Sequence, residues 1–177
     1  MSNESTPQPG SRSDTVSTIK ENLGGVAAKV LAGSTTSIEG FGDHAMVAIL
    51  YEIEAANIAL KRSRRDDVRQ FAQAMIADYS YFKSGLGSFL GATESPTEPT
   101  DKIDKVHQIL IDDLNGASDA DFDKRYISQQ QIAFSEARTL FKTYRDKGEN
   151  AGLQNLCKIA LPIVEQHAQM ARQLAAS

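Results

Sequence analysis

Apolar residues recur at alternating steps of three and four over most of this sequence, and no other feature restricts the possible fold as strongly. This spacing is typical of helices that bury one face against other helices. It is clearest near the C-terminus, where seven positions form one face: Leu153, Leu156, Ala160, Ile163, His167, Met170 and Leu174. No stretch alternates apolar and polar residues as a half-buried strand does. The sequence therefore predicts an all-α protein.

Residues that start and end helices divide this pattern into four long helices and a short one. The expected helices cover 43–64, 66–90, 101–114, 118–147 and 150–175. Ser118 and Asp121 form a pair that typically starts a helix, and Gly148 is a typical stop. The short helix would cross between the two halves. Four long helices with short connections predict a four-helix bundle over residues 38–177.

The N-terminal region divides into two parts of different composition. Residues 1–13 are rich in Ser, Pro and Gly and are expected to be disordered. Residues 14–33 predict an extra amphipathic helix that stops at Gly33, with a stripe of Val16, Ile19, Leu23, Val26 and Val30. Two interpretations stay open for this helix: it docks on the bundle, or it is a detachable arm for a partner or a membrane surface.

The charge pattern gives no indication of a nucleic-acid partner. The 177 residues carry a net charge of −4 with both signs interleaved, so a basic footprint is lacking. The basic run Lys61-Arg62-Ser63-Arg64-Arg65 is followed at once by two aspartates. We interpret this run either as a solvated junction between helices or as a contact for an anion or a partner.

The sequence also lacks the features of a membrane or secreted protein. No apolar run approaches the roughly 18 residues that span a bilayer, so we expect no integral membrane segment. Met1 to Ser13 has neither the basic nor the apolar region of a signal peptide, so we expect a cytoplasmic location. The single cysteine, Cys157, excludes an intrachain disulfide and is expected to be a small buried hydrophobe rather than a redox-active thiol.

His167 is the position around which chemistry is most expected. A buried titratable ring has to be hydrogen-bonded, bound to a metal or kept neutral, because an unpaired buried polar group costs roughly 1–3 kcal/mol. Glu52 lies on a stripe of alanines in the first long helix, and Asp78 stands beside Tyr79 in the second. Four helices packed together would bring four residues to one layer: Glu52, Tyr79, Phe134 and His167.

Three interpretations of this layer stay open. His167 forms a hydrogen bond with Glu52 or the Tyr79 hydroxyl, or Glu52 and His167 bind one metal ion with Tyr79 or Asp78, or His167 acts in acid–base chemistry. Di-iron bundles use Glu-x-x-His motifs, which the sequence lacks.

Three further expectations concern Pro162 and the other two histidines. Pro162 is expected to kink the last helix and to aim His167 inward. His44 and His107 are expected at the surface, since one lies at a helix start and the other on a helix flank.

Several short motifs resemble a bacterial family, the domain of unknown function 4142, whose members are ferritin-like and are often called putative outer membrane proteins. The motifs are Phe41, Glu52-Ile53, Ala59-Leu60, the run from Val68 to Asp78, Phe122-Asp123-Lys124-Arg125-Tyr126, and Leu161-Pro162 with His167. The resemblance covers Phe41 to Leu174 and implies a ferritin-like bundle in a stress-related setting. Many members of the family carry a signal peptide.

The chain departs from that family at two positions. The family usually has histidines where this sequence has Tyr79 and Phe134. We therefore expect a divergent member with a degenerate metal site and no cofactor, in which Glu52, Tyr79 and His167 form a polar cluster in the core. The expected function is non-enzymatic: a stress-associated bundle that binds an unknown protein partner or itself. The alternative is a metal- or oxidant-handling protein with iron, manganese or zinc at a residual centre of Glu52 and His167.

Overall fold

Helices account for nearly all of the chain that the computed structural model describes, residues 34–93 and 99–177. The elements are η1 (Ser34–Thr36), α2 (Ile38–Arg62), α3 (Asp66–Gly91), α4 (Lys105–Gly116), α5 (Asp119–Lys147) and α6 (Ala151–Ala176). No strand occurs in these two ranges, so the prediction of an all-α bundle is confirmed. The expected tail over 1–13 and the expected helix over 14–33 lie outside the described residues.

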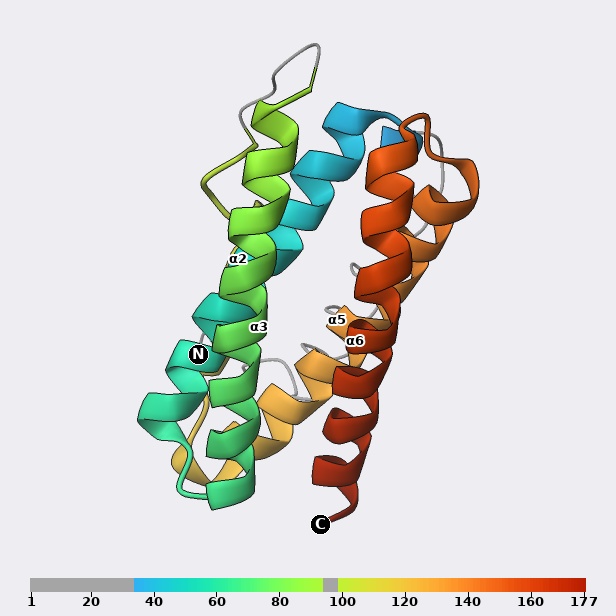
Figure 1. Cartoon of the computed structure of the whole chain (residues 1–177). Coiled ribbons are helices and arrows are strands. Elements are labelled where there is room, and N and C mark those ends of the chain that lie inside the picture. The colour runs from blue at the N-terminus through green and yellow to red at the C-terminus, as the bar shows by residue number, and fades with distance from the viewer. Residues whose placement is uncertain (1–33, 94–98) are drawn as a thin grey trace, which may run out of the picture.

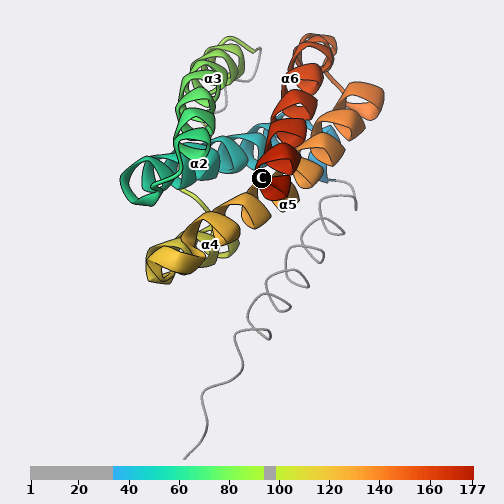
Figure 2. The same ribbon diagram turned by 90° about the horizontal axis from the view of Figure 1, so that it is seen from below.

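The four long helices form two antiparallel pairs (Figure 1). α2 packs along α3, and α5 packs along α6. The two pairs meet chiefly where α2 crosses α5, whereas α3 and α6 touch over only a short stretch. The short helix α4 packs against α2 and α5, as the view from below shows (Figure 2). The bundle is therefore two helical hairpins joined mainly along α2 and α5.

Side chains cap the start of most of these helices. Ser37, Asp104, Ser118 and Asn150 accept hydrogen bonds from the backbone N–H groups of Gly40, His107, Asp121 and Leu153 respectively. These bonds satisfy donors that a helix start leaves without partners. The predicted pair of Ser118 and Asp121 is confirmed, because the hydroxyl of Ser118 also donates to the Asp121 carboxylate at 2.7 Å.

Two helix starts differ from the prediction. α2 begins at Ile38 rather than at residue 43, so the glycines at 40 and 42 lie inside the helix and do not interrupt it. A Cβ at Gly42 would lie 2.9 Å from Cδ1 of Leu90, so glycine there allows the end of α3 to pack closely. α4 begins at Lys105 rather than at residue 101, because Asp104 is its capping residue.

The buried face of α6 is wider than the predicted stripe. It consists of Leu153, Cys157, Ala160, Leu161, Val164, His167, Ala171 and Leu174. Three residues of the predicted stripe, Leu156, Ile163 and Met170, are only half-buried. An α-helix has 3.6 residues per turn, so a face read with a strict repeat of 3.5 drifts away from the true contact line. Pro162 lies inside α6 with its ring exposed, and the helix continues through it.

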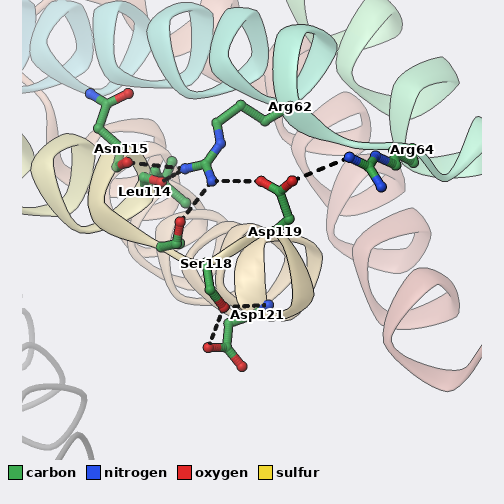
Figure 3. Close-up of polar contacts among 8 residues, drawn as sticks. Arg62, Arg64, Leu114, Asn115, Ser118, Asp119 and Asp121 are labelled. Atoms are coloured by element: carbon green, nitrogen blue, oxygen red, sulfur yellow. Dashed lines mark hydrogen bonds and ion pairs between the residues drawn. The ribbon is translucent and has the colours of Figure 1, made fainter.

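The basic run at the end of α2 makes contacts within the chain (Figure 3). The Arg62 guanidinium donates to the carbonyl oxygens of Leu114 at 2.6 Å and Ala117 at 2.7 Å. It also bonds the carboxylate of Asp119 at 3.3 Å and lies 4.8 Å from the centre of the Phe122 ring. This arginine therefore fixes the turn between α4 and α5 against the end of α2.

None of the helices in the described ranges combines the length and the apolarity that crossing a membrane requires.

Candidate functional site

The ring of His167 is buried in α6 and is bonded to Asp78 of α3. Its Nε2 lies 2.9 Å from Oδ2 of Asp78, and its side chain is only 3% exposed. The expected partners were Glu52 or the Tyr79 hydroxyl, and that expectation is wrong. Asp78 is half-exposed and lies next to Tyr79 on α3, from where its carboxylate reaches the ring at the edge of the core.

Protonation of His167 is disfavoured by its surroundings. Burial lowers the pKa of the ring below its usual value, and the Asp78 carboxylate opposes this shift only in part. The neutral ring then donates its Nε2–H to Asp78, which leaves Nδ1 as an acceptor. Nδ1 is buried and has no hydrogen-bond partner among the described residues.

Two aromatic rings pack near the imidazole of His167. The Tyr79 ring centre lies 5.8 Å from the imidazole centre, and the Phe134 ring centre lies 6.0 Å away. Phe134 also packs edge-on against Phe71, with ring centres 6.3 Å apart. The structure thus brings Tyr79, Phe134 and His167 together in one part of the core.

Glu52 is a buried carboxyl group in the middle of α2, only 3% exposed. Burial raises its pKa to about 8, against a smaller lowering by the side chain of Gln130. Burial also raises the pKa values of Tyr79 and Tyr126 well above the usual range, and the nearby charge of Glu52 adds to both shifts. Its Oε2 atom has no hydrogen-bond partner in the described part of the chain. The carboxyl group is therefore a neutral acid at pH 7.

The core contains polar side chains of α5 that sequence reasoning did not place in the site. Gln129 accepts a hydrogen bond from the Tyr51 hydroxyl at 2.9 Å and donates to the Leu110 carbonyl at 3.2 Å. Tyr126 and Gln130 are fully buried, with polar atoms that lack partners among the described residues. The signal for them was their spacing, because Tyr126, Gln130 and Phe134 follow one another at steps of four.

This donor set does not fit a metal centre of the ferritin kind. Such a centre needs several carboxylates and imidazoles that converge at one level. Here the imidazole Nε2 is bonded to Asp78, and rings rather than oxygen donors flank it. Within residues 34–93 and 99–177, no three His, Cys, Asp or Glu side chains are grouped so that they could hold a metal ion.

A cavity of about 170 Å³ adjoins this core, between α2, α3, α4 and α5. Glu52 and Tyr79 lie in its wall, and so do Glu136 and His107. Burial raises the pKa of Glu136 to about 7. His107 was expected at the surface, but its side chain is only 12% exposed and its Nδ1 lies 2.7 Å from Oδ1 of Asp104. Its ring packs on Tyr51, with centres 5.1 Å apart, which explains its burial.

A comparison with known protein families shows which family this sequence matches. The family described as "Domain of unknown function (DUF4142)" matches residues 26–174. The chain belongs to this family. Comparisons with curated proteins and with solved structures gave no match.

The DUF4142 chain also has an apolar groove at its surface between α3 and α6. Phe41, Phe82 and Leu86 lie in its wall, together with Tyr81 of α3 and Ile159 of α6. The last two are strongly exposed, at 78% for Tyr81 and 71% for Ile159. Hence two large apolar side chains of the DUF4142 chain stand in water beside an apolar hollow.

Cys157 lies on the inner side of the same DUF4142 bundle and is fully buried. Burial raises the pKa of its thiol to about 12. A thiol with such a pKa is almost entirely protonated at neutral pH, and the thiolate is the reactive form. Its contribution is therefore apolar packing.

Proposed function

We propose that this DUF4142 chain is a non-enzymatic helical bundle that acts by self-association, or by binding a protein partner, through the groove between α3 and α6. The proposed setting is the cytoplasm of a bacterium under stress, an expectation that comes from the sequence and the family resemblance. A ferritin-like origin with a degenerate metal site is part of the same proposal.

The exposure of Tyr81 and Ile159 carries this proposal. They are two of the three large hydrophobic residues that are exposed in the described part of the chain, and both border one groove. Contiguous apolar surface of this kind typically marks a protein interface. A patch that carries both protruding apolar side chains and an apolar hollow offers the two kinds of surface that a twofold interface pairs, one from each copy. This favours a second copy of the chain as the occupant.

The test replaces both side chains with a charge that an apolar interface excludes. Wild-type protein is expected to be a dimer in size-exclusion chromatography with light scattering, and the double variant Tyr81→Lys/Ile159→Lys is expected to be a monomer. The matched control is Ile109→Lys, which alters an exposed apolar residue on α4, away from the groove. It should leave the dimer intact.

Three results would bear against the proposal. A dimer that survives the double substitution shows that the groove is not the interface. A wild-type chain that is monomeric at all concentrations rules out self-association. The proposal that the groove binds a different protein then requires that the wild type capture a protein that the double variant does not. Equal capture by both would contradict the proposal altogether.

The alternative function is the handling of a metal or an oxidant at Glu52 and His167, and two atoms without partners favour it. These atoms are Glu52 Oε2 and His167 Nδ1, both buried. The measurement is metal analysis of protein purified without a chelator. The leading proposal expects iron, manganese and zinc far below one ion per chain. Near-stoichiometric metal that disappears in His167→Ala but persists in His44→Ala would establish the alternative instead.

A further inference from the structure

The cavity between α2, α3, α4 and α5 has the size of a small organic ligand. Its volume is about 170 Å³. A single water needs only about 10–15 Å³ on this kind of measure, and an engineered cavity of roughly 150 Å³ in another protein binds benzene. Apolar side chains form most of its wall, including Ala48, Ile49 and Val164. A ligand with a compact apolar body therefore matches the space.

The charged groups around this cavity are all acidic or histidine. Asp43, Glu52, Asp104 and Glu136 lie in its wall with two histidines, and none of the described residues that line it is a lysine or an arginine. Asp104 is engaged with the backbone and the ring of His107. Oε2 of Glu52 has no hydrogen-bond partner within residues 34–93 and 99–177, although the Gln130 side chain acts on the same carboxyl group. One oxygen of this buried carboxyl group is thus available to a ligand.

Glu52 and Tyr79 contribute buried polar atoms to this wall. Glu52 is 3% exposed and Tyr79 is 4% exposed. Neither Oε2 of Glu52 nor the hydroxyl of Tyr79 has a hydrogen-bond partner in the described part of the chain. Leaving such groups unsatisfied destabilises the fold, and a ligand with hydrogen-bond donors removes part of that cost.

Aromatic rings also form part of the wall. Tyr51, Tyr79 and Phe82 line the cavity, and the first two are near enough to Glu52 for its charge to affect their pKa values. Ring faces attract cations, and a cage of aromatic rings with carboxylates is a typical site for organic ammonium groups. We propose that this cavity binds a small organic ammonium ion, with the ammonium group at Glu52 and Tyr79 and the apolar body against Ala48 and Val164.

This site is distinct from the surface of the proposed function. The groove between α3 and α6 is bordered by Tyr81 and Ile159, neither of which lines the cavity. Ala45, Ile49, Phe82 and Phe141 line both and lie between them. Either proposal can therefore fail without the other.

Isothermal titration calorimetry of the full chain at about pH 8.5, where Glu52 is mostly ionised and benzylamine still carries its positive charge, tests the proposal with three probes of one shape: benzylamine, benzyl alcohol and benzoate. Benzylamine is expected to bind at one site per chain, and more tightly than benzyl alcohol by about tenfold, because a charge-assisted bond replaces a neutral one. Benzoate is expected not to bind, since the wall is acidic.

A matched pair of variants assigns the ammonium site. Glu52→Gln keeps the shape of the side chain and should weaken benzylamine about tenfold or more, with benzyl alcohol unchanged. Glu54→Gln alters an exposed glutamate one half-turn along α2 and should change neither affinity. Equal binding of benzylamine and benzyl alcohol, or benzylamine binding that Glu52→Gln leaves intact, would overturn the proposal. So would the absence of any binding by a folded wild-type chain.

Discussion

At the scale of single residues, Glu52 is held as a neutral acid inside a helical core. Its pKa is about 8, against 4.5 for the same group in water, because burial penalises the carboxylate. Glu136 is shifted in the same direction, to about 7. Burial lowers the pKa of His167 and so favours its neutral form too. The bundle therefore accommodates these groups by keeping them uncharged.

The stability of the protein should fall as pH rises from about 4.5 to about 8. In this window the unfolded chain releases the Glu52 proton and the folded chain retains it, so the free energy of unfolding decreases by up to roughly 1.4 kcal/mol per pH unit. Glu136 adds to the decrease only up to about pH 7. His167 has the opposite effect on stability. Its pKa is lower in the folded chain than in the unfolded one, so the unfolded chain takes up the proton first, and the free energy of unfolding decreases as pH falls below the usual pKa of 6.5.

The interval from about pH 7 to about pH 8 isolates Glu52. Wild-type protein should lose about 1 kcal/mol of stability across it, as measured by urea unfolding. Glu52→Gln should remove most of this dependence, whereas Glu54→Gln should keep it. Identical slopes for the wild type and Glu52→Gln would show that Glu52 is not the group responsible.

The sequence predicts which residues face inward better than it predicts their partners. Helical spacing placed Glu52 and His167 in the core, and both are buried. The bond from His167 to Asp78 was missed because it depends on how far two side chains reach across neighbouring helices, which spacing along one helix does not encode. His107 was misplaced for the same reason, since the ring that covers it, Tyr51, belongs to another helix.

At the scale of helices, the side chain of Arg62 connects three parts of the bundle: the end of α2, the end of α4 and the turn before α5. It is the last residue of α2, and its guanidinium bonds carbonyl oxygens at the end of α4 and in the turn before α5. These carbonyls belong to a helix end, where backbone acceptors lack partners in their own helix. One planar group with five donors is suited to such a cluster.

Arg62→Lys should therefore destabilise the bundle even though it keeps the charge. A lysine cannot bond several carbonyl oxygens in one plane, and we expect a loss of about 2 kcal/mol in the free energy of unfolding. The control is Arg64→Lys, because Arg64 is 88% exposed and, among the residues that the structure describes, bonds only Asp119. That change should cost less than about 0.5 kcal/mol. Equal effects of the two substitutions, by chemical denaturation, would contradict the assigned role.

Helix ends show what local sequence can and cannot specify. Ser118 and Gly148 mark the limits of α5 as predicted, because capping is a property of a few adjacent residues. The first long helix was expected to start after Gly42, at residue 43, but Gly42 is part of α2, where its lack of a side chain admits Leu90 from the end of α3. A glycine that ends a helix and a glycine that makes room for another helix look alike until the packing is known.

At the scale of the whole molecule, the class of fold followed from periodicity, and the membership of the DUF4142 family agrees with the motifs that suggested it. The groove between α3 and α6 did not follow from the sequence. It lies where α3 and α6 contact each other over only a short stretch, and this depends on how the two hairpins pack together. Tyr81 and Ile159 consequently look like ordinary members of amphipathic helices when they are considered one at a time.

The division into two hairpins has a mechanical consequence. Because α2–α3 and α5–α6 are each held together along their length and α3 meets α6 only briefly, we expect the two hairpins to move most easily as units, one against the other, at the contact of α2 with α5. The hydrogen bond between Asp78 and His167 joins α3 to α6 and therefore links the two units. We therefore expect this hydrogen bond to limit how far the two hairpins can separate.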